Sequence, residues 1–216
     1  VEPGLKGRAQ QYAKGGNPWA YREAFQCMAL HRLTGDPEYA TLARDLMDAI
    51  LRIEEKEGMG WFLFTNTAMY RYLTWLKDAK GNPFAPPDAE KRYRAILHKV
   101  AAKPESHLFS ESGTHNRVWH RYAVQKAARQ VAEQDGKPLD PRIVEYTNYH
   151  DKLIGDVGDD DDNSAGYHWV FFDAAAALYF HTGNWDAFVK HKGFRRTLAR
   201  YVEMVSPSGA CVPFGS

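Results

Sequence analysis

The residues best suited to chemistry lie in two short polar stretches. The first, Ser110–Arg121, is a glycine-containing loop that leads into a predicted helix capped by Thr114. With His115 in the first turn, Asn116 and His120 extend one face of this helix. That face continues in three small or apolar residues, Ala123, Ala127 and Val131. Polar groups there cost free energy unless they are hydrogen-bonded or lie at a cavity. These polar residues form a candidate site. The alternative is that they only cap the helix or are hydrogen-bonded within the core.

The second stretch, Gly158–Trp169, also leads from a polar loop into a predicted helix. Tyr167 and His168 fall in the first turn of that helix, which matches the placement of the polar pair in the earlier one. The four consecutive carboxylates of Asp159–Asp162 have three interpretations: a solvated loop beside a helix N-terminus, a calcium site, or catalytic carboxylates.

Helices must position both stretches, because apolar residues recur with a period of 3.6 along most of the chain and strand-like alternation is almost absent. Gly35 is expected to stop the first helix, and Asp36 with Pro37 to cap and open the second. The predicted helices cover residues 18–33, 37–57, 66–78, 88–102, 114–134, 141–153, 164–181 and 194–205. This pattern predicts an all-α fold.

A repeated motif indicates how these helices pair. Thr34–Asp36 and Thr182–Asn184 each follow an Ala-Leu pair, and each precedes a Thr-Leu-Ala-Arg run. The repeat is typical of antiparallel helix hairpins that stack into a solenoid or close into a ring. We therefore expect a single domain over residues 1–216, built of antiparallel helix hairpins that form an incomplete (α/α) toroid. The alternative is that the motif is only a common helix stop and restart.

Composition excludes several classes of partner. The chain carries a formal net charge of +1, so no whole-molecule field would hold nucleic acid or an anionic membrane, and polyanion binding would have to be local. Its apolar runs are shorter than the ~20 residues that a membrane helix needs. Cys27 and Cys211 have neither zinc nor redox spacing, and we expect buried free thiols. We expect that Val1 does not begin a signal peptide, because no basic region followed by an apolar region comes after it.

Three motifs resemble the α/α-toroid domains of the heparinase II/III and alginate-lyase group: Thr114–His120, Asn163–His168 and Val205–Gly215. The resemblance implies a polysaccharide lyase that cleaves uronate-containing glycans by β-elimination. It implies that Asn116 and His115 lie beside the uronate carboxylate and that Tyr167 is the acid/base. The remaining substrate-binding residues that it suggests are His120, His168, Arg117 and Trp119.

The same resemblance sets expectations for the context of the domain. The substrate would be a polysaccharide or oligosaccharide, the location periplasmic or secreted, and the β-sandwich partner domain of the group is missing from these residues. We expect no cofactor and no metal at the catalytic residues, with a calcium ion at Asp159–Asp162 as the open alternative.

The acidic run conflicts with the lyase roles that the resemblance implies. Asp159–Asp162 would repel an anionic uronate unless the carboxylates point away or hold a cation. One alternative is a glycoside hydrolase of the toroid class that uses the acidic residues, with Glu111 as a partner. The run also fits the short DxDD pattern of class II terpene cyclases, which nothing else in the chain supports. A non-catalytic carbohydrate-binding helical module is the third alternative.

Overall fold

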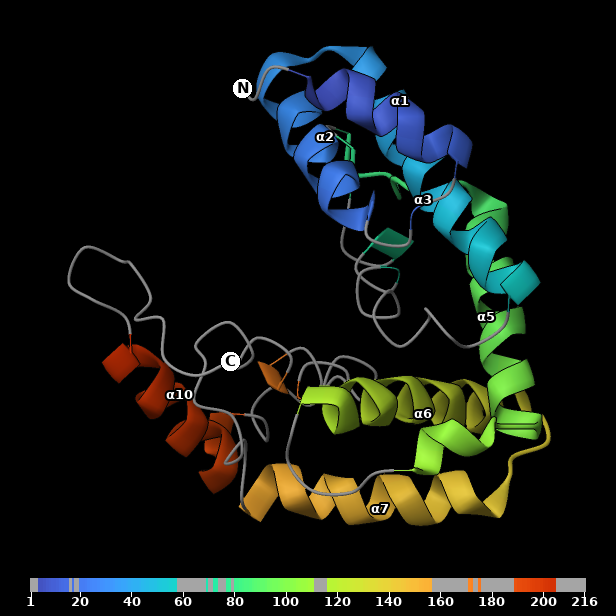
Figure 1. Ribbon diagram of the computed structural model, residues 1–216, viewed down its shortest axis with the longest axis vertical. Coiled ribbons are helices and arrows are strands. Elements are labelled where there is room, and N and C mark those ends of the chain that lie inside the picture. Colours follow the sequence, from blue (N-terminus) through green and yellow to red (C-terminus); the bar gives the residue numbers. More distant parts are fainter. Residues whose placement is uncertain are drawn as a thin grey trace. The chain divides into compact units, whose positions relative to one another are not determined.

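The computed structural model (Figure 1) describes residues 4–15, 17, 20–57, 69, 72–73, 77–78, 80–110, 116–156, 171–172, 175 and 189–204. Regular structure in these ranges is helical, and their one β feature is an isolated antiparallel bridge between Lys77 and Pro83. The predicted all-α class is therefore confirmed.

The chain divides into two compact units, residues 1–96 and 97–216. Helix α5 (Pro87–Ala102) contributes its first turns to one unit and its last turns to the other. The first unit also contains α1 (Leu5–Gly15), α2 (Tyr21–Thr34) and α3 (Pro37–Glu57). The single toroid domain over residues 1–216 stays a prediction.

In the first unit, the α2–α3 hairpin is formed as its local sequence predicts. Gly35 adopts a left-handed conformation with φ of 74°, and its N–H donates to the carbonyl of His31 at 2.8 Å. The Asp36 carboxylate then accepts the N–H of Glu38 at 2.9 Å, which caps the start of α3. These contacts confirm both the predicted stop and the predicted restart.

The core of the first unit is built mainly on α3, which packs against α1 and α2. Its fully or nearly fully buried side chains include Leu42, Ala43, Leu46, Met47, Ile50 and Leu51. Cys27 of α2 faces this core with no exposed surface, and burial raises the pKa of its thiol to about 11. The prediction of a buried free thiol is confirmed for Cys27, whereas Cys211 lies outside the described residues.

One predicted helix ends earlier than expected. Met69, Tyr72 and Leu73 are helical, but the helix predicted for residues 66–78 does not extend to its last two positions. The reason is local: the Asp78 carboxylate accepts the N–H groups of Lys80 and Asn82, at 2.8 and 2.9 Å, and so closes a turn.

The second unit contains η2 (Ser106–Phe109), α6 (Asn116–Asp135), α7 (Pro141–Asp156) and α10 (Lys192–Met204). Figure 1 shows α6 and α7 lying side by side, and polar contacts in opposite chain order show that they are antiparallel. Gly136, with φ of 59°, turns the chain after α6. The Asp140 carboxylate caps α7 by accepting the N–H of Arg142 at 2.9 Å.

Aromatic side chains form the core of this unit. Trp119 and Tyr122 of α6 meet Ile154 of α7 and Phe194 of α10, together with the helical residue Phe171. Of the helix predicted for residues 164–181, Phe171, Phe172 and Ala175 are described and are helical. The core therefore fixes α6, α7 and α10 against one another within the unit.

Candidate functional site

The structure describes four of the residues predicted for the site, all at the start of α6. Asn116 is the first residue of the helix, Arg117 is exposed, Trp119 is buried and His120 is half-buried. The other predicted positions lie outside the described residues: His115, Tyr167, His168, Glu111 and Asp159–Asp162. Whether Tyr167 and His115 share a pocket is therefore still a prediction.

The predicted inward face of α6 is confirmed along its apolar part. Ala123, Ala127 and Val131 are at most 4% exposed. His120 lies one turn before Ala123 on the same face and is half-buried. The fully buried part of this face therefore ends one turn before Ala123, at His120.

Trp119 lies in the core rather than at this opening. Its ring makes edge-to-face contacts with Tyr122 and Phe171, with centroids 6.1 and 5.4 Å apart, and it also packs on His150 at 6.0 Å. This position gives Trp119 a packing role. Its predicted contact with substrate stays a prediction.

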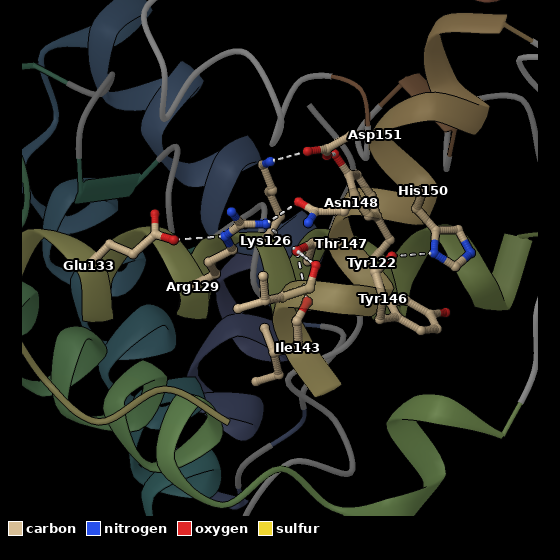
Figure 2. Close-up of polar contacts among 11 residues, drawn as sticks. Tyr122, Lys126, Arg129, Glu133, Ile143, Tyr146, Thr147, Asn148, His150 and Asp151 are labelled. Atoms are coloured by element: carbon tan, nitrogen blue, oxygen red, sulfur yellow. Dashed lines mark hydrogen bonds and ion pairs between the residues drawn. The ribbon is translucent and has the colours of Figure 1, made fainter. Parts of the chain in front are cut away.

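Sequence reasoning missed a cluster of polar residues between α6 and α7, which Figure 2 shows. The Tyr122 hydroxyl donates to one oxygen of Asp151 and the Lys126 ammonium to the other, each at 2.6 Å. Tyr122 has no exposed surface and Lys126 is 8% exposed. Asp151 therefore holds two donors from successive turns of α6, and the carboxylate compensates the buried charge of Lys126.

A second set of contacts lies further along the same two helices (Figure 2). The Arg129 guanidinium donates to the hydroxyl of Thr147 at 2.9 Å and to the side-chain oxygen of Asn148 at 2.6 Å. It also pairs with Glu133 on its own helix. The Thr147 hydroxyl donates to the carbonyl of Ile143 at 2.7 Å. Arg129 is thus held against α7 by neutral acceptors.

His150 occupies the buried face of α7 with no exposed surface. Its Nδ1 lies 2.9 Å from the carbonyl oxygen of Tyr146. Its Nε2 is buried and has no hydrogen-bond partner among the described residues. Burial lowers the pKa of this imidazole, although the Tyr146 carbonyl and the Asp151 charge act in the opposite direction. The sequence signal was available, because His150 lies seven residues after Ile143 and four before Ile154 on one helix face.

These polar groups are better suited to holding α6 and α7 together than to acting on a substrate. The Asp151 carboxylate already accepts a hydroxyl and an ammonium, and the basic Nε2 of His150 is enclosed. Within the described ranges, no group of three His, Cys, Asp or Glu residues could hold a metal ion. No helix in those same ranges has the length and apolar character of a membrane span.

Comparisons with protein-family models, curated proteins and solved structures found no match to this chain. A functional proposal must therefore rest on the residues themselves, on their positions and on the motifs described above.

Proposed function

We propose that this chain belongs to a polysaccharide lyase that cleaves uronate-containing glycans by β-elimination. The observation that supports it most directly is the start of α6 at Asn116, with His120 half-buried where the apolar stripe of that helix meets the polar stretch. A half-buried polar side chain at the end of a buried helix face lies at the boundary between core and solvent, a position from which a ligand can be contacted.

The proposed chemistry assigns one role to each part of the elimination. Asn116 and His115 bind the uronate carboxylate and so make the C5 proton more acidic. Tyr167 takes part in proton transfer: a base removes that proton, its electron pair forms the C4–C5 double bond, and the departing O4 receives a proton. His168 or His120 assists, and Arg117 and Trp119 complete the set of substrate contacts.

For the architecture, we propose that the hairpins belong to an incomplete (α/α) toroid in a single domain. Two antiparallel hairpins support this, α2–α3 in the first unit and α6–α7 in the second. In such a ring, alternate helices line the inside, so α6 and the helix predicted for residues 164–181 would be inner neighbours with their N-termini at the same rim. We further propose a periplasmic or secreted location, with a β-sandwich domain as partner.

The acidic run, Asp159–Asp162, lies apart from the sugar in this proposal or holds a cation, because four adjacent carboxylates would repel a bound uronate. Chelation of divalent ions separates the two cases. Loss of the fold or of activity with chelator supports a calcium site, and an unchanged protein supports a solvated loop.

A turnover assay tests the proposal. Incubation with alginate, glycosaminoglycans and plant or algal polyuronates should raise the ultraviolet absorbance of a 4,5-unsaturated uronate. New reducing ends without this chromophore would instead identify a glycoside hydrolase that uses the acidic residues. Saturable sugar binding without any turnover would identify a carbohydrate-binding module.

A further inference from the structure

The aromatic rings around His150 differ in how far they are buried. Trp119 and Tyr122 cover the imidazole from α6, and neither ring has any exposed surface. Tyr146 and Tyr149 cover it from α7, where Tyr146 is half-buried and Tyr149 is 51% exposed. Tyr146 lies nearest, with ring centroids 4.1 Å apart (Figure 2). On the side of the two α7 tyrosines, the cover that separates His150 from solvent is therefore thin.

This outer cover continues from α7 to η2. Phe109, the last residue of η2, packs edge-to-face on the Tyr146 ring with centroids 5.8 Å apart. The preceding residue, Leu108, is fully buried, and its carbonyl accepts the side-chain amide of Gln125 at 3.0 Å. Phe109 and Leu108 thus tie η2 to α7 and to α6. The polar stretch that contains the candidate site begins at the next residue, Ser110.

A proton added to His150 would lack a partner in this arrangement. Nδ1 already binds the Tyr146 carbonyl, and the enclosed Nε2 has no acceptor among the described residues. An enclosed imidazolium needs an acceptor or water at each nitrogen, because burying an unpaired charge costs free energy. Water reaches the ring most directly where the cover is thin, at Tyr146 and Tyr149. Protonation therefore favours a conformation in which these outer rings move away from His150.

Other charged groups near the cover do not produce the same response. The neighbouring Asp151 charge favours the proton on His150, yet burial outweighs it and lowers the pKa of the imidazole. On η2, His107 lies 3.2 Å from Glu105, and a proton on its ring would strengthen that contact rather than release it. The remaining charged groups beside the cover are paired or exposed to water: Lys126 with Asp151, Arg142 with Asp140, and the exposed Glu145 and Lys152.

We propose that Phe109, Tyr146 and Tyr149 form an acid-sensitive latch over His150, which opens when the imidazole takes up a proton. Opening separates Phe109 from Tyr146 and so releases η2 from α7. Because Ser110 follows Phe109, the first residue of the polar stretch is released with it. The latch is independent of the proposed lyase function, since it rests only on contacts among α6, α7 and η2.

The direction of the response follows from the proton balance. Above the ordinary pKa of a solvated imidazole, about 6.5, neither form binds the proton and the latch stays closed. Below that pH, the open form binds a proton that the closed form does not. Each further pH unit then shifts the equilibrium towards the open form by at most about tenfold.

Oxidation by hydroxyl radicals, followed by mass spectrometry, measures the exposure of single rings in the full chain at pH 7.5 and 5.5. Phe109 and Tyr146 should become up to about twofold more reactive at pH 5.5, since opening turns half-buried rings into exposed ones. Tyr72, which is 1% exposed in the first unit, should stay protected at both pH values. Free tyrosine and phenylalanine in the same solution correct for the direct effect of pH on the chemistry.

Two variants assign the response to His150. His150→Phe keeps a ring under the cover but does not titrate, so Phe109 and Tyr146 should react alike at both pH values. The matched control, His107→Gln, removes the histidine of η2 and should keep the wild-type response. Circular dichroism checks the fold of both. If His150→Phe does not fold, His150→Gln takes its place, because an amide is also uncharged at both pH values.

Equal reactivity of the wild-type rings at the two pH values would overturn the proposal. So would a response that persists without the His150 imidazole, or one that is lost in His107→Gln. An equal rise at Tyr72 would also overturn it, because general unfolding rather than a latch would then be the cause. None of these outcomes depends on turnover of a polysaccharide, so the latch and the lyase proposal fail separately.

Discussion

The Nδ1 atom of His150 lies 2.9 Å from the main-chain carbonyl oxygen of Tyr146. Because a carbonyl oxygen can only accept, Nδ1 must carry the proton, and the neutral ring then has a bare Nε2. Four aromatic rings surround the imidazole, from Trp119, Tyr122, Tyr146 and Tyr149, with centroids between 4.1 and 6.0 Å away. A proton added to Nε2 would find no acceptor among the described residues.

This geometry makes the stability of the second unit depend on pH. The folded-state pKa of His150 is lowered, so below about 6.5 the unfolded chain takes up a proton that the folded chain does not. Stability should therefore be full above that pH and should fall as the pH drops below it, by at most ~1.4 kcal/mol per pH unit. Urea unfolding at pH 8, 7, 6 and 5 measures the slope. In His150→Phe the slope between pH 7 and 5 should become shallower, and an unchanged slope would contradict this assignment.

Asp151 should be one of the most sensitive polar positions between α6 and α7. Asp151→Ala leaves the Lys126 ammonium and the Tyr122 hydroxyl without their shared acceptor, and we expect a loss of about 2–3 kcal/mol in the free energy of unfolding. Asp156→Ala removes an exposed carboxylate from the last residue of the same helix and should change stability by less than ~0.5 kcal/mol. Denaturant unfolding of both variants makes the comparison. Similar losses in the two would show that the Asp151 contacts contribute little.

Gly155 is a position where the space for a side chain is limited. A Cβ there would lie 2.8 Å from Nδ1 of His191, so Gly155→Ala should force that ring to move and destabilise the fold. Gly7→Ala, in the middle of α1 with no atom within 4 Å of its Cβ, should stabilise by about 0.5–1 kcal/mol. Thermal unfolding compares the two. The double variant Gly155→Ala/His191→Ala should recover stability relative to Gly155→Ala, and no recovery would point to a clash other than with the ring.

Tyr167 gives the sharpest test of the proposed elimination. Tyr167→Phe removes one proton-transfer group and little surface, so it should abolish formation of the unsaturated product while oligosaccharide affinity stays within a few-fold of wild type. His115→Ala should lower turnover and affinity together, because this residue is assigned to the carboxylate. Full turnover in Tyr167→Phe would exclude it as the acid/base.

The sequence predicted helices well where apolar periodicity and turn chemistry agreed. For α3, the bounds Pro37–Glu57 match the prediction, because Gly35 and Asp36 mark the junction and the buried leucines follow at regular spacing. The sequence did not predict α1. The buried residues of this helix are only Leu5 and Ala9, and it contains Gly7. Such a helix forms through tertiary contact with α3, which is not visible in its own pattern.

The site was predictable to a smaller extent. The start of α6 and its buried stripe were predicted from local residue spacing. The partners of its polar residues lie on α7, and only the structure shows which residues they are. Nothing in the sequence of α6 shows that Lys126 is buried or that Tyr122 and Lys126 share one carboxylate. Long polar side chains reach across to residues on another helix, and periodicity along one helix carries no information about them.

The contacts between α6 and α7 also determine which alignment of the two helices is allowed. Lys126 faces Asp151, and Arg129 faces Asn148. Sliding α7 by one turn, about 5.4 Å, would bring Arg129 opposite Val144 in one direction or Lys152 in the other. The first shift leaves the guanidinium without an acceptor on α7, and the second places two cations together. The polar side chains thus help to set the register of the hairpin, because both of its nearest alternative alignments lose the contacts of Arg129 with α7.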